Sequence, residues 1–133
     1  MFVVWLNNSP FFFREDLLFG CYFLSSHWPR IASLYAELSA IASSPVVELN
    51  RAIAIAMAEG PEVGLAIVEG LACEPSLKGY HLLPSVRGDL LFRLGRFEEA
   101  SAAFQDAAAQ TQNRREQDLL GRRANDAANR RRR

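Results

Sequence analysis

The sequence contains few cysteines and no long apolar run, and both features narrow what the chain can be. Its two cysteines, Cys21 and Cys73, cannot build the disulfide framework of a small secreted domain. No uninterrupted apolar stretch reaches the roughly 20 residues that a membrane-spanning helix needs. The N-terminus also lacks the basic segment that precedes the apolar part of a secretion signal. We therefore expect a cytoplasmic protein with reduced thiols and no membrane contact.

Motifs that carry chemistry are equally scarce. The chain has no glycine-rich phosphate loop, no serine-based nucleophile elbow and no close Cys/His spacing for a metal ion. Glu98 and Glu99 are neighbours in a predicted helix, where their side chains diverge by about 100°, so we interpret them as favourable charges in its first turn. We expect His81 to have a capping or surface role and Cys73 to be a small buried residue. The sequence thus predicts no enzymatic activity, no cofactor and no metal.

The charges are balanced overall but unevenly distributed. Residues 114–133 contain eight arginines and three acidic residues, a net charge of +5, which leaves −5 for the first 113 residues. Such an end could contact nucleic acid or an acidic protein surface. Acidic residues interrupt it and no aromatic residue is interleaved, so we favour a solvated helix followed by a frayed basic tail, 130–133. We expect no direct contact with nucleic acid.

Half of the 133 residues are hydrophobic, and alanine and leucine are abundant, which favours one all-helical domain. Proline near helix starts and glycine near helix ends mark the boundaries. They predict helices within residues 25–42, 43–60, 61–73, 80–95, 96–111 and 113–130, with Ser26, Ser44 and Asn113 as caps of the first, second and last. Residues 1–26 form an atypical apolar segment, in which we expect a helix near 14–25. Short links require neighbouring helices to be antiparallel.

Apolar residues recur with the 3.6-residue period of a helix that has one apolar side. In the first predicted helix they are Ile31, Leu34, Tyr35, Leu38 and Ile41, and in the second they are Val46, Leu49, Ile53 and Met57.

A weak internal repeat is visible. Gly60 and Gly95 each end one helix just before the next begins, and they lie 35 residues apart, close to the period of tetratricopeptide hairpins. Small residues at fixed steps would let paired helices approach closely, and an aromatic ring would fill the space beside the contact. We assign this packing role to Trp28, Tyr35, Gly88, Gly95, Ala100, Phe104 and Ala107, with a looser match at Gly64, Val68 and Leu71.

This repeat predicts antiparallel helical hairpins stacked as a short, right-handed tetratricopeptide-like array over residues 27–129. An irregular helical bundle is the alternative. The tight turn at Gly95 favours a positive φ, which glycine adopts without strain.

Four polar residues interrupt the apolar helices: Asn50, Arg51, Arg87 and Asp89. Buried polar groups need partners, so these residues either form an interhelical polar network or line a concave groove that holds a peptide. We favour the structural role.

Two segments, "SPVVELNRAIAIAMAEGPEVGLAIVEGL" and "GYHLLPSVRGDLLFRLGRFEEASAAFQDA", together with "WPRIASLYAEL", resemble a known family. They are similar to the C-terminal tetratricopeptide-like extension of extracytoplasmic-function RNA polymerase sigma factors of bacteria. Ser44 to Ala52 is the most specific match. A second match begins at Tyr80 and His81 and ends at Leu94, Gly95 and Arg96.

The resemblance covers residues 28 to about 123 and lacks the two upstream sigma regions that read promoter DNA. It therefore implies a regulatory, protein-binding module of a sigma factor. This module would be a fragment or truncated form that does not recognise promoters itself. Its expected partner is a protein: the sigma regions, RNA polymerase or a regulator. The alternatives are a general tetratricopeptide-like adaptor unrelated to transcription, a remnant without function and, least favoured, a helical enzyme. The oligomeric state is left open.

Overall fold

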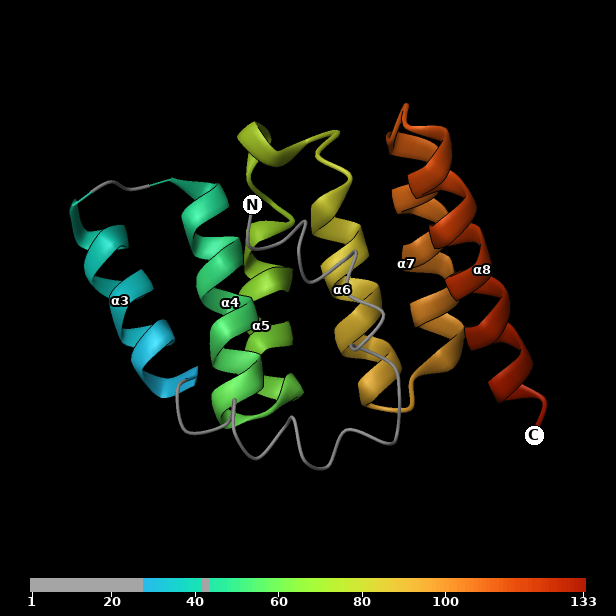
Figure 1. Ribbon diagram of the computed structural model, residues 1–133, viewed down its shortest axis with the longest axis horizontal. Coiled ribbons are helices and arrows are strands. Elements are labelled where there is room, and N and C mark those ends of the chain that lie inside the picture. Colours follow the sequence, from blue (N-terminus) through green and yellow to red (C-terminus); the bar gives the residue numbers. More distant parts are fainter. Residues whose placement is uncertain (1–27, 42–43) are drawn as a thin grey trace.

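The computed structural model describes residues 28–41 and 44–133, and over that range it is all-helical with no strand, as the sequence predicts (Figure 1). Its elements are α3 (Trp28–Ile41), α4 (Pro45–Glu59), α5 (Pro61–Leu71), the short 3₁₀ helix η2 (Pro75–Leu77), α6 (Leu82–Arg93), α7 (Phe97–Gln110) and α8 (Arg114–Arg131).

Local chemistry explains most of these boundaries. Pro45 and Pro61 occupy the first positions of α4 and α5, where the missing N–H has no helical partner to lose. Gly60 joins these two helices with φ +120°, and Gly95 joins α6 to α7 with φ +76°. The predicted positive φ at Gly95 is therefore confirmed. Asn113 caps α8 by accepting a hydrogen bond from the Arg115 N–H at 3.0 Å.

The helices form two layers. In the view of Figure 1, α4, α6 and α8 lie side by side, and α5 and α7 lie behind them. Two side-chain contacts bridge the first layer: Arg93 of α6 donates to the Met57 sulfur of α4 at 3.0 Å, and Arg123 of α8 pairs with Asp89 of α6. Each helix also packs against its neighbours along the chain. α6 consequently lies in the middle of the molecule.

Because α6 is central, it contributes many residues to the hydrophobic core. Eight residues of α6 are buried, including two polar ones, Ser85 and Asp89. The largest side chains with less than 2 % exposure include Leu49 of α4, Leu91 of α6 and Phe104 of α7, so all three helices contribute to one core. Burying a leucine or phenylalanine side chain stabilises the fold by about 1.5–3 kcal/mol.

Two glycines allow helices to touch closely. A Cβ added at Gly64 of α5 would overlap the Cβ of Ala56 and lie 2.8 Å from the carbonyl oxygen of Ala52, both on α4. A Cβ added at Gly88 of α6 would lie 2.8 Å from two ring carbons of Phe104 on α7. Each hairpin therefore has one glycine whose missing side chain sets the distance between its helices.

The structure differs from the sequence pattern at several positions. Three members of the first apolar stripe are exposed, Leu34 by 53 %, Leu38 by 43 % and Ile41 by 86 %, because α3 lies at the edge of the described helices and packs against α4. Val46 is exposed as well, since the buried side of α4 is turned toward Leu49, Ala52, Ile53 and Ala56. Ser44 occupies the predicted N-cap position of α4, but its side chain makes no capping hydrogen bond with the described residues. Cys73 is exposed because it follows the end of α5.

The basic end also differs from the expectation of a frayed tail. α8 remains helical to Arg131, and the side chains of residues 130–133 are exposed.

The predicted N-terminal segment, its helix near 14–25, the Ser26 cap and Cys21 lie outside the described residues. Among the helices that are described, none combines the length and apolar character needed to cross a membrane.

Candidate functional site

The four polar residues singled out in the sequence do not form one cluster. Asn50 and Arg51 lie on α4, and Arg87 and Asp89 lie on α6. Arg51 pairs with Glu48 of its own helix at 3.2 Å. The Asn50 Oδ1 atom is buried and accepts no hydrogen bond from the residues that the structure describes. The two residues of α6 instead reach other helices in two different directions.

Arg87 points toward α5. Its Nη2 atom lies 3.5 Å from Oε1 of Glu69, and both side chains are partly exposed. A second pair stands nearby, in which Arg96 donates two hydrogen bonds, of 2.8 and 2.6 Å, to Glu99 of α7. The positive charge of Arg87 also acts on Glu99, whose pKa is lowered mainly by its hydrogen bonds from Arg96. Charges of alternating sign thus run across one surface of α5, α6 and α7.

Asp89 points toward α8 and is buried. Its Oδ1 atom lies 3.2 Å from Nη1 of Arg123, and the two side chains are only 10 % and 9 % exposed. Burial disfavours the carboxylate strongly enough to raise the pKa of Asp89 to about 6, although the charges of Arg123 and Arg93 act in the opposite direction. The sequence marked Asp89 as needing a partner but gave no sign of Arg123, which lies 34 residues further along.

The raised pKa of Asp89 predicts a specific pH dependence of stability. Native Asp89 holds its proton up to about pH 6, whereas the unfolded carboxyl loses it near its ordinary value of 3.8. Between these values the native state binds more protons, so this group's contribution to the free energy of unfolding falls as pH rises, by at most about 1.4 kcal/mol per pH unit.

The variant Asp89→Asn tests this, because an amide does not titrate in this pH range. We expect the difference in unfolding free energy between wild type and Asp89→Asn, measured with urea at stepped pH, to shrink from pH 4 to pH 6. A difference that stays constant would contradict this.

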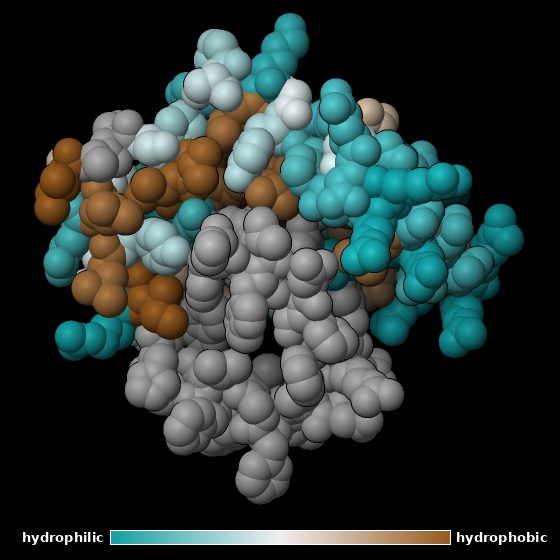
Figure 2. Space-filling view, turned by 45° about the horizontal axis from the view of Figure 1, so that its top comes forward, coloured by the Kyte–Doolittle hydropathy of each residue, from teal (hydrophilic) through white to brown (hydrophobic). Residues whose placement is uncertain are grey.

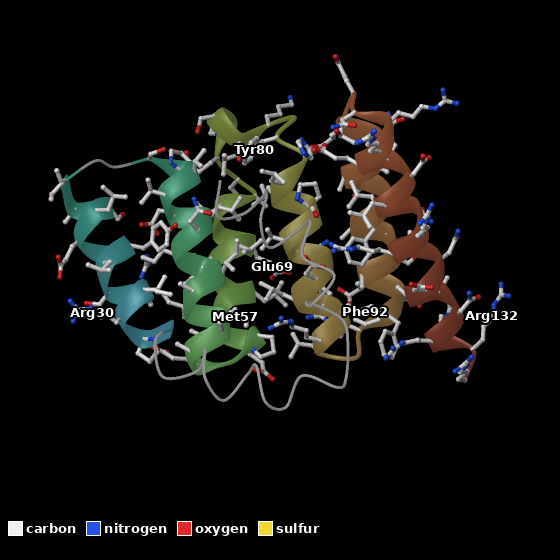
Figure 3. All side chains as sticks on the ribbon, in the orientation of Figure 1. Arg30, Met57, Glu69, Tyr80, Phe92 and Arg132 are labelled. Carbon is white, nitrogen blue, oxygen red and sulfur yellow. The ribbon has the colours of Figure 1, made fainter. Side chains whose placement is uncertain are left out.

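An open groove of about 500 Å³ lies on the surface that carries the alternating charges. α5, the segment around η2, α6 and α7 together surround it. Its apolar part is formed by Ala72, Leu77, Leu83 and Pro84, and its polar part by Glu69, Lys78, Arg87, Asp106 and Gln110, with Gly79 completing the lining. We call this the α5–α7 groove. Figure 3 places Glu69 near the middle of the molecule. Of the four polar residues named from the sequence, Arg87 alone lines the groove.

Three of the residues predicted to hold the hairpins, all on α7, are buried, whereas Gly95 is exposed and no atom of the described residues stands within 4 Å of a Cβ added there. Ala100, Phe104 and Ala107 of α7 have no exposed surface, and Phe104 meets Gly88 of α6. Tyr35 of α3 is half-buried, and this burial raises the pKa of its hydroxyl. Trp28 begins α3.

His81 occupies the N-cap position of α6, but its side chain makes no capping hydrogen bond with the described residues and reaches α8 instead. Its Nε2 atom lies 3.0 Å from Oε2 of Glu116, and the same carboxylate oxygen accepts a hydrogen bond from the Thr111 hydroxyl at 2.6 Å. Thr111 is buried. These contacts tie the start of α6 to the link between α7 and α8, which is a structural role. The sequence predicted the cap at Asn113, which lies close to Thr111 and Glu116 along the chain, but not the contact with His81.

Within residues 28–41 and 44–133, no group of three or more His, Cys, Asp or Glu side chains is placed to hold a metal ion. The arrangement offers shape and charge for binding a partner. The expectation that the chain is not an enzyme stays a prediction.

Comparison with known proteins adds a relative but no function. The chain is 46 % identical over 86 residues to "Uncharacterized protein R00370" of Rhizobium meliloti (strain 1021). The matched part is 65 % of this chain and 20 % of that protein, so the match spans about a fifth of the relative's length. No protein-family profile matches the chain, and no solved structure does.

Proposed function

We propose that the chain is a protein-interaction module that binds a segment of a partner protein in the α5–α7 groove. The observation that carries the proposal is the groove itself, which combines apolar side chains with charges of both signs. Sites that hold ligands are concave and largely apolar, with a few polar groups that fix orientation. The guanidinium group of Arg87 and the carboxylate of Asp106 would pair with opposite charges on the bound segment.

We further propose that the helices form a tetratricopeptide-like array. Contacts between successive helices of one layer join residues close to one repeat apart: Met57 and Arg93 are separated by 36 residues, and Asp89 and Arg123 by 34. A period near 34 is typical of such repeats. Hairpin stacking of this kind creates extended binding surfaces.

The resemblance to the extension of extracytoplasmic-function sigma factors suggests the partner. On this proposal the bound segment belongs to RNA polymerase, to sigma regions that read promoter DNA, or to a regulator of these, and the module influences transcription initiation. A general adaptor unrelated to transcription would use the same groove for another protein.

The test uses the full chain immobilised on a sensor surface. The probes are purified RNA polymerase core and sigma regions 2 and 4 from the bacterium that encodes the chain. The groove variant is Arg87→Glu with Asp106→Lys, which reverses two charges without changing the net charge. The control is Arg114→Glu with Asp118→Lys, the same reversal at exposed positions of α8 that do not line the groove.

We expect at least one probe to bind the wild type and the control equally, and to bind the groove variant about tenfold more weakly. Binding that the groove variant leaves unchanged would reject the groove. Failure of every probe to bind would reject the link to transcription and favour the general adaptor.

A further inference from the structure

We propose a second interaction surface, which does not depend on the proposed function: the groove between α7 and the last turns of α8 binds an acidic segment of a protein partner. We call it the α7–α8 groove. Arg131 and Arg132 supply its positive charge. The partner is identified by its chemistry, a protein segment that carries several carboxylates.

The shape of the α7–α8 groove suits a peptide. It encloses about 580 Å³ and is lined by Glu98, Ser101, Ala102, Gln105, Ala128, Arg131 and Arg132. The alanines and the serine are small, so a bound segment can lie close to both helices. The Ser101 hydroxyl donates to the carbonyl oxygen of Ala124 at 2.9 Å, which joins α7 to α8 beneath the groove. A volume of this size is within the range of ligand-binding clefts.

The arginines are held in place rather than carried on a loose tail. α8 is helical to Arg131, and Arg130 lies over the Phe92 ring with its Cζ atom 5.0 Å from the ring centre. Nη1 of Arg131 lies 3.1 Å from Oε1 of Glu98 on α7. The helical backbone and the contact of Arg130 with Phe92 thus position the end of α8 beside α6, and the exposed pair between Arg131 and Glu98 adds a weak contact to α7. Groups that are already positioned lose less conformational entropy when a ligand binds.

The charge at this end fits an acidic partner. Four consecutive arginines, 130–133, stand against Glu98, which is the acidic residue in the lining of the groove. Figure 2 shows hydrophilic residues gathered on the side of α7 and α8, and hydrophobic residues on the side of α3 and α4. Figure 3 shows Arg132 at the end of α8. Guanidinium groups bind carboxylates through paired hydrogen bonds, which adds direction to the attraction.

The internal ion pair can be replaced. The side chains of Arg131 and Glu98 are 61 % and 71 % exposed, and water screens pairs this exposed, so they contribute little to stability. A carboxylate from a partner can therefore take the place of Glu98 beside Arg131 at little cost.

A protein segment fits this surface better than nucleic acid. Single-stranded nucleic acid is held by aromatic side chains that stack on bases, and the lining of the groove contains none. Nucleic acid is the competing outcome in the experiment.

The experiment measures fluorescence anisotropy with the full chain and a labelled peptide of alternating glutamate and alanine. The same peptide with glutamine in place of glutamate and a labelled single-stranded DNA oligonucleotide serve as comparison probes. The test variant is Arg131→Gln with Arg132→Gln. The matched control is Arg114→Gln with Arg115→Gln, which removes the same charge at the opposite end of α8. A third variant, Glu98→Gln, removes the internal competitor.

We expect the acidic peptide to bind the wild type and the control alike, about tenfold more weakly to the Arg131/Arg132 variant, and more tightly to Glu98→Gln. The glutamine peptide should not bind. Equal losses in test variant and control would show a general effect of net charge and overturn the proposal. Tighter binding of DNA than of the acidic peptide would also overturn it.

Discussion

Replacing Gly64 by alanine is expected to lower the free energy of unfolding by about 2 kcal/mol. The added Cβ would overlap the Cβ of Ala56 and lie 2.8 Å from the Ala52 carbonyl oxygen. Both obstacles are held by the α4 backbone, so no flexible side chain can move aside, and α4 and α5 must separate. Overpacking of this kind costs typically 1–3 kcal/mol, sometimes more. The gain in helix propensity from glycine to alanine, about 1 kcal/mol, offsets only part of it.

The same helix provides a matched control. Gly70 also lies on α5, and nothing stands within 4 Å of a Cβ added there. Gly70→Ala should therefore raise stability, by up to about 1 kcal/mol. Urea unfolding of the two variants measures the effect, and their difference cancels the helix propensity. If the two alanines change stability by the same amount, the close contact between α4 and α5 is not as described.

Replacing Asp89 by alanine should have a comparable effect at neutral pH, for an electrostatic reason. The change leaves the guanidinium group of Arg123 buried without its carboxylate, and breaking one side of a buried ion pair costs about 3–5 kcal/mol. The exposed pair between Arg96 and Glu99 offers the contrast. Glu99→Ala should lower the free energy of unfolding far less, because water screens that pair.

A double variant separates the electrostatic contribution of the ion pair from the contribution of its packing. Asp89→Leu combined with Arg123→Met replaces both charges with apolar side chains, and we expect it to be much more stable than Asp89→Ala. Urea unfolding at neutral pH gives the free energy of unfolding of the wild type, the two alanine variants and the double variant, provided that their m-values are equal. A loss below 1 kcal/mol for Asp89→Ala would mean that Arg123 reaches water in the native state.

Local features of the fold can be predicted from the sequence because helix boundaries depend on local geometry. Pro45 and Pro61 mark the starts of α4 and α5, and Gly60 and Gly95 mark the turns after α4 and α6. Gly88 and Phe104 were both expected at helix contacts from their places in a repeat, and the structure shows that they meet each other. Asn113 was identified as a cap because capping involves residues two positions apart.

Contacts between distant parts of the chain were not predictable in the same way. The sequence contains many arginines that could pair with Asp89. The partner is Arg123 because α8 lies beside α6 in the folded structure. The apolar period of α3 was correct as a pattern, yet Leu34, Leu38 and Ile41 are exposed because periodicity does not say which helices cover a face.

The sequence by itself determined that the described chain is helical, where its helices start and stop, and which hairpins need small residues, because all of these follow from local backbone geometry and side-chain size. The tertiary structure alone decided which charges are buried, where grooves form, and that Arg131 and Arg132 end a helix fixed to the body of the protein. Those properties depend on which helices become neighbours, and adjacency is set by the packing of the whole chain.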